Sequence, residues 1–541
     1  MIDLNVDPMK ARPFVLAALM LLAPVGVPAS ENASPPGVNP FVESRPAEPT
    51  HLDPSAFSDV PIPAGRVDAA VAQLDAMAEA ALATTGVPGM AIAVVHRDRV
   101  VYLKGFGRRS LDGEARVDAE TVFQLASLSK PVAATVVAAA VDRSMIAWDD
   151  PIVRHLPDFA LSDPAITLRV TIADLFAHRS GLPDHAGDLL EDMGYGRAEI
   201  LSRLRFYPLA PFRASYAYTN FGLTAAAEAV ARAAGTPWDD LSRDLLYGPL
   251  GMTSTSSRFA DFAAAPNHAI GHIRRDGLWM VTPEVRQPDA QSPAGGVSSS
   301  VTDMAQWMRL LLAEGALDGK AVIGSEALAR IHSPNLMSSP LRGPSSRPSF
   351  YGLGLGVGVD SAGRVRWSHS GAFLLGAATT LAMLPSESLG ILILTNGQPV
   401  GAPEGIAASF LELVETGEVR HDWSALYRGA MAGFYQVHTQ FGEAPATPAP
   451  ARPLDAYVGH YANDLYGPAV VEATEAGLVL RLGPSPTGLL LSHFDGDAFT
   501  FRPIGENGLG ISGAVFAFEG DRAVFLQVEY LDEEGLGTFR R

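Results

Sequence analysis

The chain has 541 residues, a formal net charge of −19 and 47% hydrophobic residues, a length that suits about three domains. The acidic balance, with no basic cluster, argues against nucleic acid and anionic membrane surfaces as partners. The sequence contains no cysteine, which excludes thiol nucleophiles, disulfides and cysteine–metal sites.

The first predicted element is a targeting segment. Lys10 and Arg12 precede an apolar run at 14–23, and small residues follow at 27–29. This order is typical of a secretory signal peptide, so residues 1–29 are expected to direct the protein to the periplasm or out of the cell. The run is too short for a stable membrane anchor, although an uncleaved anchor remains the alternative.

Composition divides the rest of the chain into two structural units and two connecting segments. Residues 30–62, rich in Pro, Ser and Ala, and residues 441–453, rich in Pro and Ala, are predicted linkers. The larger unit covers 63–440. The smaller unit, 454–541, is a run of short alternating strand patterns without a helix signal and predicts a small all-β barrel or sandwich.

Within the larger unit, strand patterns occur at both ends and helix patterns in the middle. Residues 67–82 predict an amphipathic helix, and residues 89–107 predict two strands around a tight turn. Helix patterns dominate 120–315, and strands return over 350–396. This order predicts an α+β fold: an antiparallel sheet built from both ends and flanked by helices, with an all-helical second lobe.

A lysine marks the start of the most apolar helix pattern. Of the 40 Lys and Arg residues only four are lysines, at positions 10, 104, 130 and 320. Arg cannot lose its proton in a protein, whereas a buried Lys can. Lys130 is therefore a candidate base, and a lysine that snorkels from a helix start is the alternative.

Ser127 lies three residues before Lys130. Positions i and i+3 share a face of a helix, so a neutral lysine at 130 can accept the proton of the serine hydroxyl and make it a nucleophile. The free backbone N–H groups at a helix start favour developing negative charge. Pro131 suits the first turn of such a helix, which is expected to begin near Ser127.

Two further motifs follow in order along the chain. Tyr218-Thr219-Asn220 precedes a helix pattern, and His369-Ser370-Gly371 ends the strand pattern "VRWSHSG". With Ser-x-x-Lys, which occurs once, they resemble the class C β-lactamase-like and penicillin-binding-protein-like serine hydrolases. Second copies exist for both motifs: Tyr461-Ala462-Asn463 is interpreted as chance, and His185-Ala186-Gly187 comes too early in the chain.

The resemblance implies a site without metal or cofactor. Its catalytic residues are Ser127, Lys130 and Tyr218, and its substrate-binding residues are Asn220, His369, Gly371 and Ala372. In this family the serine attacks, the lysine and tyrosine handle protons, and Asn220 binds a substrate carbonyl or the lysine. The backbone N–H groups of Ser127 and Ala372 would hold the oxyanion.

The expected function is that of a secreted serine hydrolase that cleaves an ester or amide bond through an acyl-enzyme. Its substrate is a small molecule or a peptide, with a D-amino peptide or a β-lactam among the options. His369 stands where typical class C β-lactamases have lysine, so strong β-lactamase activity is not expected. The alternative is a penicillin-recognising sensor or an inactive homologue that acylates without turnover. The sequence leaves the substrate and the oligomeric state open.

The tail at 454–541 resembles the lipocalin-like domain appended to such hydrolases. Because the motifs all precede the second linker, we expect the tail to restrict access to the cleft or to mediate assembly, without taking part in the chemistry. A chain that ends near Thr447 should then still hydrolyse small activated esters.

Overall fold

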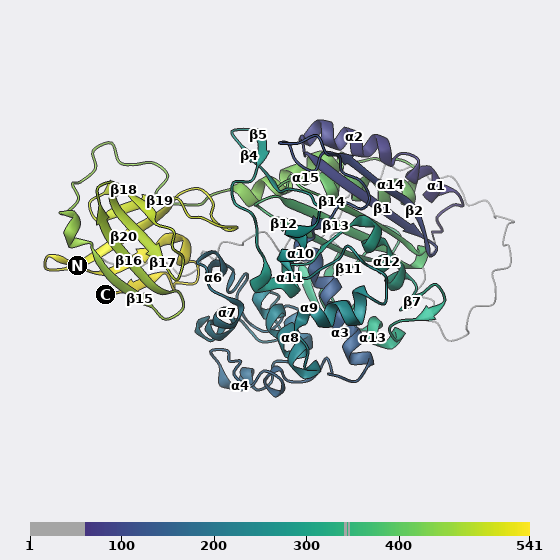
Figure 1. The fold of residues 1–541 in the computed structure, drawn as a ribbon, viewed down its shortest axis with the longest axis horizontal. Coiled ribbons are helices and arrows are strands. Elements are labelled where there is room, and N and C mark those ends of the chain that lie inside the picture. The colour runs from purple at the N-terminus through teal and green to yellow at the C-terminus, as the bar shows by residue number, and fades with distance from the viewer. Residues whose placement is uncertain (1–59, 340–342, 344–346) are drawn as a thin grey trace.

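The computed structural model describes residues 60–339, 343 and 347–541. The predicted signal peptide, 1–29, and nearly all of the predicted first linker, 30–62, lie outside the described residues. Figure 1 shows two units side by side, a large one of helices and sheet and a small barrel formed by the C-terminal strands. In the described part of the chain, no helix combines the length and the apolar character needed to cross a bilayer.

The large unit is built on an antiparallel sheet in the order β2-β1-β14-β13-β12-β11-β10-β9. This confirms the α+β fold predicted from the sequence, because strands from both ends of the segment are neighbours. The turn at Arg97 and Asp98 has φ values of 51° and 59°, as a tight hairpin requires. The strands are β1 (Gly89–His96), β2 (Arg99–Gly107), β9 (Leu336–Ser339), β10 (Ser349–Tyr351), β11 (Gly356–Val359), β12 (Val365–Phe373), β13 (Ala377–Leu384) and β14 (Leu389–Thr395).

The sheet is covered on both faces, and β1 shows how the sequence encodes this. Ala91 and Ala93 face one core, whereas the alternate residues Ile92 and Val94 face the other, since successive side chains of a strand point to opposite sides. One face packs on α1 (Arg66–Val71), α2 (Leu74–Thr85) and α14 (Ala402–Thr416), and the other on α3 (Ser129–Asp142) and α12 (Val301–Leu312). Helix α15 (Trp423–Ala432) packs on α14. The helix predicted at 67–82 is thus two helices.

The second lobe is mostly helical and surrounds α3, which contacts α8, α11 and α13. Burial on every side explains why α3 is apolar all round. The remaining helices are α4 (Pro164–Thr167), α5 (Ile172–Phe176), α6 (Asp188–Asp192), α7 (Arg197–Arg203), α8 (Asn220–Ala234), α9 (Trp238–Ser242), α10 (Phe259–Ala264), α11 (Ser292–Gly295) and α13 (Ser325–Ala329). Short strand pairs join β3 (Phe123–Gln124) to β6 (Ser298–Ser299), β4 (His272–Arg275) to β5 (Leu278–Val281), and β7 (Ala316–Leu317) to β8 (Lys320–Ala321).

The tail is a closed antiparallel barrel, as its strand patterns predicted. Large buried side chains, among them Tyr457, Tyr461 and Phe539, fill its interior, so alternate residues of each strand form a core. The strands are β15 (Gly459–Asn463), β16 (Gly467–Thr474), β17 (Gly477–Leu482), β18 (Leu489–Asp495), β19 (Ala498–Phe501), β20 (Ser512–Glu519), β21 (Arg522–Val528) and β22 (Thr538–Arg540).

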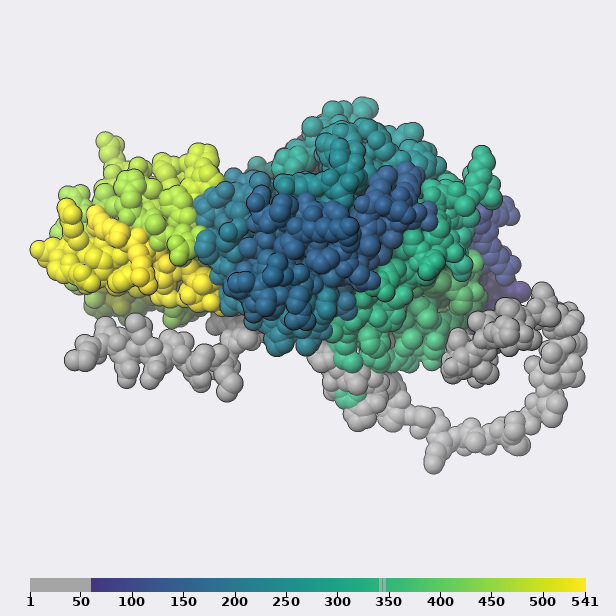
Figure 2. All heavy atoms as spheres, turned by 90° about the horizontal axis from the view of Figure 1, so that it is seen from below, coloured from purple at the N-terminus to yellow at the C-terminus, as the bar shows by residue number. Residues whose placement is uncertain are grey.

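The barrel is docked on the helical lobe. Figure 2 shows its yellow and light-green atoms directly against the blue atoms of that lobe. The Tyr195 hydroxyl donates to the Tyr466 carbonyl at 2.9 Å, and Arg203 donates to the Leu465 carbonyl at 2.7 Å. The segment 441–453 lies along the barrel, where the Gly496 N–H donates to the Ala449 carbonyl at 2.9 Å.

Candidate active site

Ser127 lies in a short 3₁₀ turn, Ala126–Leu128, that leads into α3. The helix therefore begins two residues later than the sequence suggested. Ala126 has φ 47°, a left-handed conformation that costs energy for a residue with a Cβ. The turn is held in place by the Leu125 N–H, which donates to the Val297 carbonyl at 2.9 Å. Among the buried residues of this turn, Ser127 is partly exposed.

Lys130 is fully buried at the base of this turn. Its Nζ contacts Ser127 Oγ at 3.0 Å, Asn220 Oδ1 at 2.6 Å and the Ala294 carbonyl at 3.0 Å. Burial lowers the pKa of Lys130 to about 7, and the nearby charge of Asp188 opposes this shift. An ammonium group in this place can therefore lose its proton near neutral pH.

Tyr218 lies over the same amine, with Lys130 Nζ 4.4 Å from the centre of its ring. Burial raises the pKa of Tyr218 well above the usual value, although a hydrogen bond with Ser127 opposes the shift. The phenol thus stays protonated where Lys130 titrates. His178 supports the loop, since its Nδ1 accepts the Thr219 N–H at 3.2 Å.

Asn220 connects the lysine to an acidic residue. Its Nδ2 donates to Asp188 Oδ2 at 2.7 Å, and the same oxygen lies 2.7 Å from His185 Nδ1. Although burial disfavours the charged imidazole, contact with Asp188 raises the pKa of His185. The chain Lys130–Asn220–Asp188–His185 fixes the orientation of the Asn220 amide, because its oxygen faces a donor and its nitrogen faces an acceptor.

The surroundings of His369 favour a neutral imidazole. Its Nδ1 lies 2.7 Å from the Ser370 carbonyl and therefore carries the proton, so Nε2 accepts from the Tyr351 hydroxyl at 2.9 Å. Burial and the charge of Lys130 lower the pKa of His369 to about 3. The third motif therefore contributes a neutral imidazole where lysine would contribute a positive charge.

Gly371 lets strand β12 approach the serine turn closely. A Cβ at this position would lie 2.4 Å from the Leu125 carbonyl and 2.8 Å from the Ser127 nitrogen, distances that only glycine permits. The pairing of β11 with β12 ends at Ser368, so the last part of β12 faces the turn. Ala372 follows on this part of the strand.

The structure thus brings together the seven residues singled out by sequence, and it adds groups that sequence reasoning missed. His185 was set aside because its His-x-Gly motif comes early, yet it lies beside Asp188 at the site. Its spacing of three residues from Asp188 was the available signal. Tyr351 and Ala294 lie in stretches, 351–358 and 292–308, that also resemble the family, but the sequence assigned neither group to the site. Within the described residues, no group of three or more His, Asp or Glu side chains is arranged to hold a metal ion.

Comparisons with known proteins show the family of this chain and relate its fold to solved structures. A family model described as Beta-lactamase matches residues 74–414, and a domain of unknown function, DUF3471, matches residues 443–535. Unguisins hydrolase ungD of Aspergillus violaceofuscus is 26% identical over 76% of this chain and 80% of its own length. Penicillin-binding protein 4 of Amycolatopsis lactamdurans is 28% identical over 68% of this chain and 91% of its own. The solved octameric penicillin-binding protein homologue from Pyrococcus abyssi shares the fold, with a TM-score of 0.56 and 17% identity, over 87% of this chain and 100% of that one.

Proposed function

Because the chain belongs to the beta-lactamase family, a family of serine hydrolases, we propose that it cleaves an ester or amide bond through an acyl-enzyme on Ser127. The observation that carries the proposal is the buried Lys130 amine, 3.0 Å from Ser127 Oγ and with its pKa lowered to about 7. A base whose pKa lies near the working pH is the most effective at accepting a proton in the transition state.

The reaction follows from the state of each group. Neutral Lys130 accepts the Ser127 proton while Oγ bonds to the substrate carbonyl carbon, and the carbonyl oxygen takes the charge in front of the Ser127 and Ala372 N–H groups. Tyr218 stays a phenol, so it relays the proton to the leaving group. Asn220 binds the substrate carbonyl substituent or holds Lys130, and water then hydrolyses the acyl-enzyme.

The motif His369-Ser370-Gly371 narrows the range of expected substrates. His369 has its pKa lowered to about 3, so it supplies no positive charge for a carboxylate beside the scissile bond. We therefore favour neutral esters and amides over β-lactams. His369→Lys should increase the rate on a cephalosporin relative to that on a p-nitrophenyl ester.

The decisive experiment is labelling with a fluorophosphonate, together with kinetics on an ester, a D-amino acid amide and a cephalosporin. Ser127→Ala should lose labelling and turnover, whereas Ser361→Ala, an exposed serine, should keep both. Label that persists in Ser127→Ala would overturn the proposal. One equivalent of product without turnover would favour the rival function, a penicillin-recognising protein that acylates and stops.

Secretion is part of the proposal and rests on residues 1–29. It is tested by N-terminal sequencing of the protein from the periplasmic or extracellular fraction. A new N-terminus just after Ala29 is the expected result, and protein that stays in the cytoplasm with an intact N-terminus would contradict it.

A further inference from the structure

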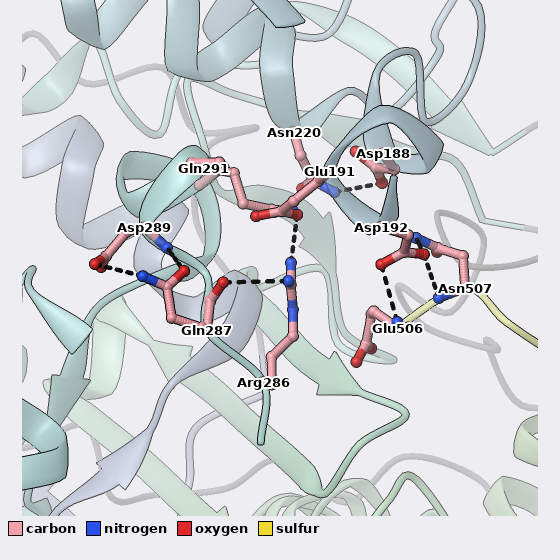
Figure 3. A network of polar contacts seen from close by, with 12 residues as sticks. Asp188, Glu191, Asp192, Asn220, Arg286, Gln287, Asp289, Gln291, Glu506 and Asn507 are labelled. Carbon is pink, nitrogen blue, oxygen red and sulfur yellow. Dashed lines mark hydrogen bonds and ion pairs between the residues drawn. The ribbon is translucent and has the colours of Figure 1, made fainter. Parts of the chain in front are cut away.

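A loop of the barrel contacts the large unit next to the catalytic site, at α6 and at the turn after β12. The loop joins β19 to β20, and its residues Glu506 and Asn507 lie against Asp192 of α6 (Figure 3). Asp192 of α6 holds the loop, since its carboxylate accepts the Glu506 N–H at 3.0 Å and the Asn507 N–H at 2.9 Å. A Cβ at Gly505 would lie 2.5 Å from Asp192, so the contact requires glycine there.

Glu506 extends from this loop to the turn after β12. Its two carboxylate oxygens accept the N–H groups of Leu374 and Leu375, at 2.5 and 3.3 Å. These residues follow Phe373, the last residue of β12, and lead into β13. A carboxyl group that accepts two successive backbone N–H groups restricts the turn to one conformation.

The two attachments of the loop lie next to the two halves of the site. Helix α6 carries Asp188, which binds the Asn220 amide. Strand β12 carries His369 and Gly371, and the Ala372 N–H lies two residues before the turn that Glu506 binds. The loop therefore links the helical lobe to the sheet, through Asp192 on one side and Glu506 on the other.

Burying this carboxylate is costly, which argues that it has a role. Burial raises the pKa of Glu506 to about 8, although Arg286 opposes the shift. Arg286 is itself buried and paired with Glu191 Oε2 at 2.5 Å, and its guanidinium lies 5.0 Å from the ring of Phe373. A cavity of about 600 Å³ lies beside these groups, with walls from α6, the segment 284–290, the turn after β12 and the barrel loop.

We propose that Glu506 is a positioning residue for the oxyanion hole: the barrel, through this side chain, holds the end of β12 so that the Ala372 N–H faces the reacting carbonyl. The inference rests on the proposed function. It replaces the expectation that the tail takes no part in the chemistry, and it predicts that a chain ending near Thr447 loses most of its activity on small esters. A displacement of about 1 Å at such a group can cost about 100-fold in rate.

The test compares Glu506→Ala, Glu506→Gln and Glu475→Ala on p-nitrophenyl acetate. Glu475 is a matched control because it is exposed in the turn between β16 and β17 of the same barrel. Glu506→Ala should lower kcat by roughly 10- to 100-fold with KM nearly unchanged. Glu506→Gln keeps one acceptor and should fall between Glu506→Ala and the unmodified enzyme, and Glu475→Ala should match the unmodified enzyme.

A second readout separates positioning from a general loss of structure. Phenylboronic acid forms a tetrahedral adduct with the serine and places an oxygen in the oxyanion hole, so its affinity should fall by the same factor as kcat. Asp192→Asn combined with Glu506→Gln should lower kcat by less than the product of the two single-variant factors, because both residues act through one loop.

The outcomes distinguish this inference from the proposed function. Unmodified enzyme that neither hydrolyses the ester nor labels at Ser127 would overturn the proposed function. Active enzyme in which Glu506→Gln keeps its full kcat and boronate affinity would overturn the inference alone. If Glu506→Ala does not fold, the kcat and boronate affinity of the nearly isosteric Glu506→Gln still test the inference.

Discussion

The tripeptide Tyr-x-Asn occurs in two regions of this protein with different consequences. At the site, Tyr218 lies over Lys130 Nζ at 4.4 Å and Asn220 Oδ1 accepts from the same amine at 2.6 Å. In the barrel, the Tyr461 hydroxyl donates to the Tyr457 carbonyl at 2.7 Å, and Asn463 Nδ2 donates to the Leu536 carbonyl at 2.7 Å. The second copy therefore closes backbone hydrogen bonds, and the cation over its tyrosine ring is Arg541, at 5.9 Å, which keeps its proton.

The difference shows that the motif acquires chemistry from its neighbours. Both tyrosines are buried, and burial raises the pKa of both phenols. Only the first has a buried amine and a serine hydroxyl within reach. The predictions below test this contrast, from the largest expected effect to the smallest.

The largest effect is expected at Lys130, the group that the barrel copy lacks. Lys130→Arg should be nearly as damaging as Lys130→Ala, because arginine keeps the charge but cannot give up its proton. Loss of a general base predicts a fall of about 10²- to 10⁴-fold in kcat for an ester. Near-normal activity of Lys130→Arg would mean that the residue acts only through its charge.

Replacement of the two tyrosines tests the contrast directly. Tyr218→Phe removes the proton relay and should lower kcat by about 100-fold. Tyr461→Phe should leave kcat within about twofold and instead lower the free energy of unfolding by about 1 kcal/mol, the usual worth of one hydrogen bond. Steady-state kinetics and urea unfolding of both variants provide the measurement. Equal losses of kcat in the two variants would contradict a catalytic role that belongs to Tyr218 alone.

The pH dependence of the reaction tests which form of Lys130 works. A base must be neutral, and the pKa of Lys130 is lowered to about 7. The kcat/KM for a neutral ester should therefore fall about tenfold per pH unit below 7 and level off above it. A rate that instead falls as the pH rises through 7 would mean that the protonated amine is the active form.

Asp188 should move this pH profile by a smaller amount. Its charge raises the pKa of Lys130 against the effect of burial, so Asp188→Asn should shift the acid limb to lower pH by a fraction of a unit. The control is Asp521→Asn on the exposed barrel surface, for which the profile should not move. If the midpoint of the acid limb is the same in Asp188→Asn as in the unmodified enzyme, the charge of Asp188 does not influence the pKa of Lys130.

Sequence patterns were sufficient to predict the architecture of both units. The alternation in β1 and in the barrel strands, the apolar α3 and the turn at 97–98 are local patterns with local causes. The start of α3 differs from the sequence prediction. The 3₁₀ turn at Ala126–Leu128 depends on contacts with Val297 and β12, which are distant in the chain.

The seven site residues could also be proposed from the sequence, because each belongs to a short motif in which the reacting groups have a set spacing. By itself the sequence determined the α+β fold, the barrel and the chemical identities of Ser127, Lys130 and Tyr218. Only the tertiary structure decided the protonation states of the site residues and their hydrogen-bond partners. The buried environment lowers the pKa of Lys130 and keeps His369 neutral, and Glu506 reaches β12 from a loop more than a hundred residues further along the chain. Desolvation and long-range contacts depend on what the fold places around a residue, and no local pattern encodes them.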